Sequence, residues 1–256
     1  MNLYFNTELA KNYCSHSQIV RILTEDWLAN NVYCPCCGTY PVEQFENNTP
    51  VGDFYCTSCQ EQYELKSKHA KSLGSKIADG AYHTMLERIN SNTNPSFFFL
   101  SYDKKDWKVN NLIIVPKHFF TTDIIIPRQK GIPNRPNYIM CSINTGALPN
   151  TGKISLIEQG KVVHQDKVIE QWKKNFYLRE MKTESKGWLL TTMSYIDRLP
   201  NDEFSLRQLY DFEHELSLKY PNNTHIKDKL RQQLQFLRDQ GMIEFLGRGR
   251  YRKVSQ

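Results

Sequence analysis

The sequence predicts a mixed α/β domain followed by a smaller domain of helices and a β-hairpin. In the first part of the chain, helical and strand patterns follow the order helix, strand, strand, strand, helix, strand, strand. Two pairs of closely spaced cysteines interrupt the first strands. After a polar stretch without periodic apolar residues, from Arg179 to Lys186, three helical patterns precede a hairpin rich in glycine and arginine. We therefore expect domains at residues 1–180 and 181–256.

Composition limits the class of protein. The net charge is +6, and between Lys227 and Gln256 eight Lys and Arg residues face three Asp and Glu residues. This basic segment is compatible with nucleic-acid binding. Because no secretory segment follows Met1 and no apolar run is long enough to span a bilayer, we expect a cytoplasmic protein with reduced thiols and no membrane partner.

The first elements are a helix and two strands. Apolar residues at helical spacing predict a helix over 17–29, whose Glu25 is either an ordinary surface charge, the favoured interpretation, or an extra acid of a metal site. Residues 51–55 predict a strand, and Glu64 and Lys66 lie on a second one. Residues two apart on a strand share a face, so Glu64 and Lys66 should point the same way.

The cysteines between these elements predict a structural zinc site. Cys34 and Cys37 form one pair, and Cys56 and Cys59 form a second pair about twenty residues later. Four thiolates in two such turns suit tetrahedral Zn²⁺. A disulfide or redox pair is the alternative. Cys36 is the spare cysteine, because a Cys-x-Cys spacing is too short for this kind of turn.

The second pair of cysteines lies between two acidic residues. A hairpin of the two strands would place Asp53 beside Glu64, with Lys66 next to both. Two carboxylates and a lysine are suited to holding Mg²⁺ and assisting water in phosphodiester hydrolysis. The pattern Asp…Glu-x-Lys is the PD-(D/E)XK nuclease signature, although such triplets also occur as solvated strand faces.

Further elements complete the first domain. We expect a helix over 76–90, buried strands at 97–100 and 112–115, a strand at 153–158 and a helix at 168–178. Residues 121–152 predict a long loop, in which Arg128, Lys130, Arg135 and Tyr138 suit contacts with DNA or, alternatively, an ordinary solvated loop.

The second domain predicts a winged helix-turn-helix. Helices are expected at 188–196, 205–220 and 225–240, and strands at 242–246 and 251–254. Side chains of the third helix would enter the major groove, and those of the hairpin would contact phosphates or a minor groove. The candidate DNA contacts are Lys227, Arg231, Gln232, Gln235, Arg248, Arg250 and Arg252. The alternative is a winged helix that contacts protein.

These segments resemble the DpnI-type restriction endonucleases over nearly the whole chain. The resemblance rests on residues 21–27, 33–35, 53–56, 64–68, 79–82, 94–100, 231–235 and 247–249. It implies a PD-(D/E)XK core with an inserted four-cysteine zinc site, and Mg²⁺ held by Asp53, Glu64 and the Leu65 carbonyl, with Lys66 assisting the water. It also implies cleavage of both strands of DNA at GATC containing N6-methyladenine, a site that both domains read. We expect the protein to be a monomer in solution. Tyr138 falls where such enzymes carry a tryptophan in the methyladenine pocket.

Two other functions remain open. One is a zinc-containing winged-helix regulator without enzymatic activity, in which Asp53, Glu64 and Lys66 are surface charges. The other is a PD-(D/E)XK nuclease that ignores methylation.

Overall fold

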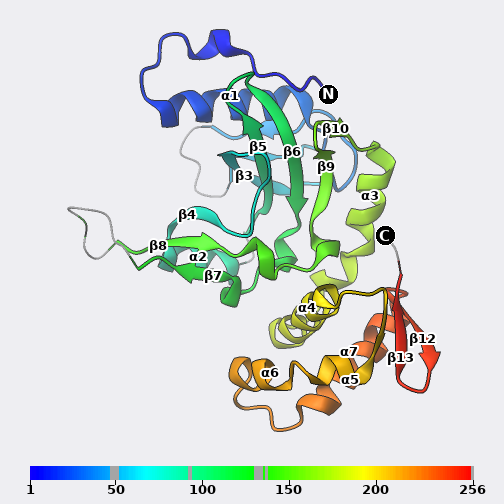
Figure 1. The fold of residues 1–256 in the computed structure, drawn as a ribbon. Coiled ribbons are helices and arrows are strands. Elements are labelled where there is room, and N and C mark those ends of the chain that lie inside the picture. The colour runs from blue at the N-terminus through cyan, green and yellow to red at the C-terminus, as the bar shows by residue number, and fades with distance from the viewer. Residues whose placement is uncertain (47–51, 92–93, 130–134, 136–137, 255–256) are drawn as a thin grey trace. The chain divides into compact units, whose positions relative to one another are not determined.

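The computed structural model describes the chain except for residues 47–51, 92–93, 130–134, 136–137 and 255–256. The chain forms two compact units, Met1–Glu180 and Met181–Gln256 (Figure 1). Each unit is described by itself below.

A seven-stranded mixed sheet forms the centre of the first unit. Its strand order is β1-β2-β3-β5-β6-β9-β10, with β3 and β5 parallel and the other neighbours antiparallel. The strands are β1 (Glu43–Gln44), β2 (Phe54–Tyr55), β3 (Gln62–His69), β5 (Ser96–Asp103), β6 (Lys108–Val115), β9 (Ile154–Glu158) and β10 (Lys161–Val162). Val51, the first residue of the expected strand at 51–55, lies outside the described residues.

The middle of this sheet is apolar on both faces. Phe97, Phe98 and Phe99 follow one another on β5 and have no exposed surface, as the continuous apolar run predicted. Helix α1 (His16–Asn31) packs on β3, and helix α3 (Gln165–Lys174) packs on β9 (Figure 1). Trp27 of α1 and Trp172 of α3 belong to the same buried cluster, so both helices anchor the sheet that carries Glu64 and Lys66.

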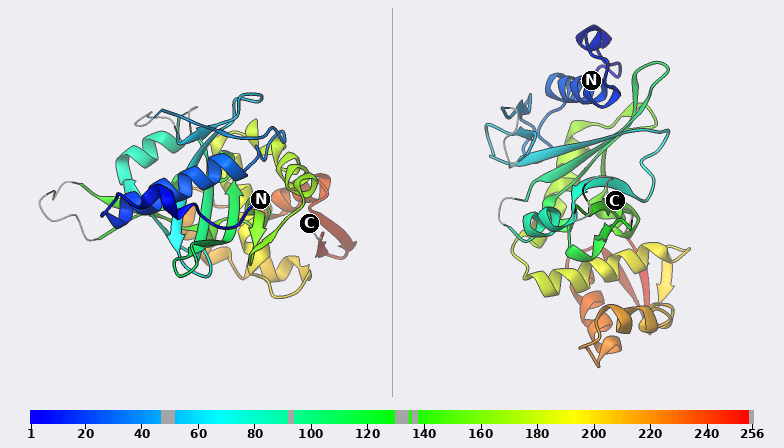
Figure 2. Two further views of the ribbon diagram at one scale, coloured as in Figure 1. Left: turned by 90° about the horizontal axis from the view of Figure 1, so that it is seen from above. Right: turned by 90° about the vertical axis from the view of Figure 1, so that its left-hand side faces the viewer.

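A second, three-stranded sheet corrects two expectations. It consists of β4 (Ile77–Ala81), β8 (Met140–Ile143) and β7 (Ile125–Pro127), in that order. The expected helix at 76–90 is therefore a strand followed by the shorter helix α2 (Tyr82–Ile89), and the expected loop at 121–152 contains two strands. Helix α2 packs on all three strands, and the small sheet is seen beside the large one in both figures (Figure 1 and Figure 2).

Short 3-10 helices connect the remaining segments of the first unit. They are η1 (Thr7–Ala10), η2 (Lys117–Phe119), η3 (Thr122–Ile124), η4 (Thr145–Ala147), η5 (Asn150–Gly152) and η6 (Phe176–Arg179). The helix expected at 168–178 is thus observed as two elements, the end of α3 and the short helix η6.

The second unit combines four helices with a three-stranded sheet. Its elements are α4 (Thr183–Arg198), β11 (Glu203–Ser205), α5 (Leu206–Tyr210), α6 (Glu213–Lys219), α7 (Ile226–Asp239), β12 (Ile243–Gly247) and β13 (Arg250–Lys253). Ser205 caps α5 as expected, because its hydroxyl accepts from the backbone N–H of Gln208 in a capping box. The single helix expected at 205–220 is wrong, since it breaks between α5 and α6.

The hairpin β12–β13 and the additional strand β11, which pairs with β13, form the expected wing. The fold class predicted from the sequence, a mixed α/β domain followed by a helix-turn-helix type domain, is confirmed. No helix in the described part of the chain has both the length and the apolar character that crossing a bilayer requires.

Candidate active site and zinc site

The hairpin of β2 and β3 brings Asp53 beside Glu64. Phe54 pairs with Tyr63, and the Asp53 N–H donates to the Tyr63 carbonyl at 2.9 Å. The Asp53 carboxylate in turn accepts the Leu65 N–H at 2.8 Å. Gly52 permits this approach, because a Cβ there would lie only 2.9 Å from the Tyr63 carbonyl oxygen. A short, closely packed hairpin therefore fixes the Asp53 side chain against the strand that carries Glu64.

Lys66 lies between two carboxylates. Its Nζ is 2.5 Å from Glu64 Oε1 and 2.5 Å from Asp79 Oδ1. The other oxygen of Glu64 forms an ion pair with Arg88. The side chains of Glu64 and Asp79 are 11% and 7% exposed, so these charges are largely shielded from water.

Asp79 and Arg88 were missed as site residues in the sequence. Asp79 comes from β4 and Arg88 from α2, both inside the segment expected to be one helix. Segment 79–82 belongs to the resemblance, but nothing in its spacing relative to Glu64 and Lys66 indicated a contact.

The predicted site residues lie in a groove of about 580 Å³. Asp53, Glu64, Leu65 and Lys66 all line it, and its other side is formed by residues of α1. Glu25 of α1 also lines the groove, accepts from Gln44 at 2.8 Å and pairs with Arg21 at 2.7 Å. The favoured interpretation of Glu25 as an ordinary surface charge does not describe this position, because its side chain is only 15% exposed.

The groove alters the acid-base properties of Asp53 and Lys66. Burial raises the pKa of Asp53, an effect that the hydrogen bond from the Leu65 N–H partly opposes and the nearby Glu64 charge increases. Burial lowers the pKa of Lys66, but the two adjacent carboxylates outweigh it, so the pKa of Lys66 is raised. Asp53 is therefore a carboxylate whose ionised form a bound cation would stabilise.

The four predicted zinc ligands converge at the other end of the same hairpin. The Sγ atoms of Cys34, Cys37, Cys56 and Cys59 all lie within 4.8 Å of one another. Two of the pairs, Cys34 with Cys59 and Cys37 with Cys56, are 3.5 Å apart. A tetrahedron with Zn–S bonds of about 2.3 Å has edges of about 3.8 Å, so this cluster could hold zinc. The first turn also needs Gly38, whose φ of +85° is in the left-handed region.

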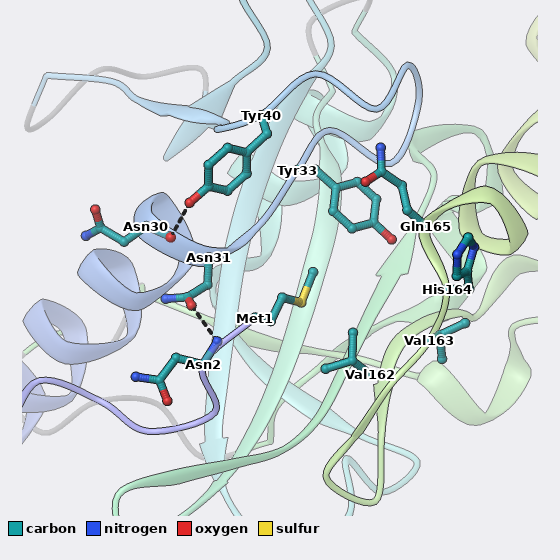
Figure 3. Close-up of a pocket in the computed structure, with 10 residues that line it drawn as sticks. All are labelled: Met1, Asn2, Asn30, Asn31, Tyr33, Tyr40, Val162, Val163, His164 and Gln165. Atoms are coloured by element: carbon teal, nitrogen blue, oxygen red, sulfur yellow. Dashed lines mark hydrogen bonds between the residues drawn. The ribbon is translucent and has the colours of Figure 1, made fainter.

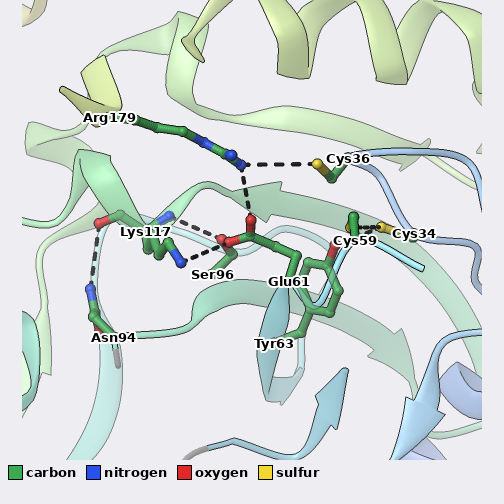
Figure 4. Close-up of polar contacts among 9 residues, drawn as sticks. All are labelled: Cys34, Cys36, Cys59, Glu61, Tyr63, Asn94, Ser96, Lys117 and Arg179. Carbon is green, nitrogen blue, oxygen red and sulfur yellow. Dashed lines mark hydrogen bonds and ion pairs between the residues drawn. The ribbon is translucent and has the colours of Figure 1, made fainter. Parts of the chain in front are cut away.

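The spare cysteine belongs to a neighbouring polar network (Figure 4). Cys36 lies outside the four-sulfur cluster and accepts from Arg179 at 3.9 Å. Arg179 also donates to Glu61 at 2.9 Å, and Lys117 lies 3.2 Å from the other Glu61 oxygen. The side chain of Glu61 is 6% exposed, whereas those of Arg179 and Lys117 are 36% and 37% exposed. Glu61 thus holds together three segments that are distant in the sequence.

A second hollow, of about 600 Å³, is lined by different residues (Figure 3). It lies between the end of α1, the first zinc turn and the start of α3, and its walls are mostly amides and aromatic rings. None of Asp53, Glu64 and Lys66 lines it. The groove lined by Asp53, Glu64 and Lys66 is therefore the candidate active site.

Two of the candidate DNA contacts, Arg135 and Tyr138, lie on the connection between β7 and β8. Arg135 is exposed, and its carbonyl accepts from the N–H of Tyr138 at 3.0 Å. Tyr138 is half-buried, and a Cβ at Gly80 would lie 3.9 Å from its hydroxyl. Neither residue lines the groove of Asp53 and Glu64. Lys130, which was also a candidate contact, lies outside the described residues.

Helix α7 has one buried and one exposed face. The buried residues are Ile226, Leu230, Gln233, Leu234 and Leu237. Arg231, Gln232 and Gln235 are exposed, and so is the side chain of Lys227, at 49%. Two of the four are paired with acids of the same unit, Lys227 with Glu213 at 3.0 Å and Arg231 with Asp228 at 2.8 Å. Exposed ion pairs of this kind contribute about 0–1 kcal/mol to stability, so the phosphates of DNA can replace the acidic partners of Lys227 and Arg231.

The wing presents the other three arginines. Arg248 is exposed in the turn between β12 and β13 and has a φ of +49°. Arg250 and Arg252 both pair with Glu203 at 2.8 Å, and Arg252 also lies 3.2 Å from Glu244. Glu203 comes from β11, so the additional strand supplies a shared acidic partner for two of the three arginines.

Comparison with protein families covers both units. Residues 1–181 match the model of DpnI, the Dam-replacing family. Residues 184–253 match that of DpnI_C, the Dam-replacing HTH domain. Nearly the whole chain is accounted for by these two matches, in the order in which the two compact units occur. The chain therefore belongs to the DpnI, or Dam-replacing, family of methyl-dependent restriction endonucleases.

Proposed function

We propose that this protein makes Mg²⁺-dependent double-strand cuts in DNA at GATC sites that contain N6-methyladenine. The observation that carries the proposal is the convergence of Asp53, Glu64 and Lys66 on one groove, in a chain of this family. A non-enzymatic regulator would not need Asp53 and Glu64 beside Lys66 in one groove, because removing charged side chains from water costs free energy even when they are paired.

Asp53, Glu64 and the Leu65 carbonyl are the proposed Mg²⁺ ligands. All are oxygen donors, which is the donor type that Mg²⁺ prefers, and all three residues line the groove. The raised pKa of Asp53 reflects a carboxylate that burial disfavours, and a bound cation would compensate for it. Mg²⁺ at this position would supply Lewis acidity at the scissile phosphate.

Lys66 is the proposed partner of the attacking water. Its ammonium is held within the groove, where it can orient the water by hydrogen bonding and offset the charge that develops on the phosphate oxygens. Arg88 neutralises the side of Glu64 that faces away from Lys66. The chain thus positions both the substrate phosphate and the water before reaction.

The zinc site is proposed as a structural one. All four ligand positions would be filled by protein thiolates, which leaves no open position for a substrate. Cys56 and Cys59 belong to the turn that joins β2 to β3, so Zn²⁺ would stabilise the hairpin that bears Asp53 and Glu64.

Recognition of the methylated site is proposed for both units. In the first unit Tyr138 and Arg135 would contact the base and the backbone. In the second, α7 would enter the major groove and the wing would contact phosphates. A methyl group is worth only about 1–3 kcal/mol at one reader. Two readers would multiply the selectivity, and a host with unmethylated DNA would need no protective methylase.

The test is a digestion of one plasmid prepared with and without adenine methylation at GATC, in Mg²⁺. Cutting confined to the methylated plasmid, and absent from the Asp53→Ala and Lys66→Ala variants, is the expected result. DNA binding should survive in Lys66→Ala. Cutting of both plasmids would retain the nuclease and reject methyl dependence, whereas binding without cutting by the unaltered protein would favour the regulator.

A further inference from the structure

Lys66 has two carboxylate partners, and only one of them is proposed to bind metal. Glu64 Oε1 and Asp79 Oδ1 each lie 2.5 Å from Lys66 Nζ. If Glu64 holds Mg²⁺, part of its negative charge is neutralised by the cation, and its attraction for the ammonium weakens. Asp79 is then the partner that keeps its full charge.

Asp79 contacts Lys66 from outside the groove. It does not line the groove in which Asp53, Glu64 and Leu65 lie. Its side chain is 7% exposed, so little water competes for the ammonium. A buried carboxylate outside the groove is suited to holding Lys66 without displacing Glu64 from a cation.

The backbone around Asp79 fixes its position. The Gly80 N–H donates to the same Oδ1 atom at 2.7 Å. Asp79 pairs with Cys141 of β8, and the register shifts between Asp79 and Ala81 at a bulge. Strand β4 is bound into the small sheet on one side (Figure 1), so the carboxylate is held by rigid secondary structure and not by a loop.

We propose that Asp79 is a positioning residue for Lys66. Its carboxylate would keep the Lys66 ammonium in position during cleavage, while Glu64 binds the metal. The proposal rests on the proposed function and deepens it, because it adds a residue outside the Asp…Glu-x-Lys pattern. Asp79 need not touch the DNA or the metal. Its effect should therefore fall on the rate of the chemical step and not on the affinity for DNA.

The test is the Asp79→Asn variant of the full chain. Asn has nearly the same size and retains an oxygen for the Gly80 N–H, so the variant removes the charge with little change in shape. Asp106→Asn is the matched control, because Asp106 is an exposed residue of the same type in the turn between β5 and β6. Cleavage is measured under single turnover with saturating protein on a methylated GATC duplex, and affinity is measured by fluorescence anisotropy without divalent metal.

The expected result is a loss of about 10- to 100-fold in the cleavage rate of Asp79→Asn. Its DNA affinity and melting temperature should remain close to those of the unaltered protein, and Asp106→Asn should cleave normally. Cleavage by Asp79→Asn at the normal rate would overturn the proposal. A loss of affinity or of melting temperature that parallels the loss of rate would also overturn it, because Asp79 would then be structural.

The unaltered protein separates this inference from the function on which it rests. If that protein cleaves and Lys66→Ala does not, a normal rate in Asp79→Asn rejects only the role of Asp79. If the unaltered protein does not cleave methylated DNA at all, the proposed function fails and this inference fails with it.

Discussion

The network around Glu61 predicts an unusual order of stabilities among charge variants. Removing both cationic partners, as Lys117→Met together with Arg179→Met, should destabilise the protein more than neutralising the acid in Glu61→Gln. The reason is that Glu61 is 6% exposed, whereas Arg179 and Lys117 are 36% and 37% exposed. Without partners, the buried carboxylate cannot reach water, but the two cations can.

The distances set the size of the effect. At 2.9 Å and 3.2 Å, each pair has a Coulomb energy of about 5 to 6 kcal/mol for an effective dielectric constant of about 20. The desolvation of Glu61 offsets much of this gain. An uncompensated buried charge costs about 3–5 kcal/mol, which is the expected loss for the double variant. Glu61→Gln should cost only about 1–2 kcal/mol, since it loses charge-assisted hydrogen bonds but leaves no buried ion.

Calorimetric melting of the zinc-loaded full chain measures these differences. A loss of 1 kcal/mol lowers the melting temperature of a protein of this size by about 2–4 °C, so the double variant should melt roughly 10 °C lower. Adding Glu61→Gln to the double variant should restore at least half of that loss. The control replaces two exposed lysines, Lys104 and Lys105, by Met.

The triple variant is the decisive one. If it is as unstable as the double variant, the loss of stability comes from the packing of the Lys117 and Arg179 side chains and not from the unpaired Glu61 carboxylate. The electrostatic explanation would then be rejected.

Two further predictions concern the metal sites. Cys37→Ser should purify with less than one zinc per chain and with a destabilised hairpin, whereas Cys36→Ser should retain zinc. Metal analysis of both variants measures the zinc content. Loss of zinc from Cys36→Ser would contradict the assignment of Cys36 as the spare cysteine. Asp53→Asn should melt at a higher temperature than the unaltered protein at pH 7 without added Mg²⁺, because burial raises the pKa of Asp53 and its ionised form therefore opposes folding. This advantage should shrink as the pH falls through the folded-state pKa and disappear below the unfolded value of about 3.9, where Asp53 is protonated in both states. A melting curve at several pH values tests the sign, and a lower melting temperature for Asp53→Asn at pH 7 would show that the carboxylate stabilises the fold.

The sequence predicted the parts of the site that lie close together along the chain. Asp53 directly precedes β2, and Glu64 and Lys66 lie on β3, which pairs with β2 through a short turn, so their meeting follows from hairpin geometry. The two cysteine pairs belong to the same hairpin and to the turn after α1, and their spacing alone indicated a metal site.

Asp79 could not be found in this way, because the pattern around it fits two structures. Ile77 and Ala81 are four residues apart, which places them on one face of a helix and equally on one face of a strand. The strand prevails because β4 pairs with β8, more than fifty residues later in the chain. No local signal reports a pairing over that distance. The same pairing converts part of the expected loop at 121–152 into strands.

The turn between β2 and β3 also determines which side chains of β3 face the groove. On β3, Glu64 and Lys66 face the groove because a fixed number of residues separates them from Cys59. One residue inserted after Cys59 would turn both side chains to the opposite face and present Leu65 in their place. With Zn²⁺ bound to the four cysteines, the turn could not absorb such an insertion by slipping, because the sulfur atoms would fix where the strand begins. Chains that descend from a common ancestor with this one should therefore keep the same number of residues between Cys59 and Glu64.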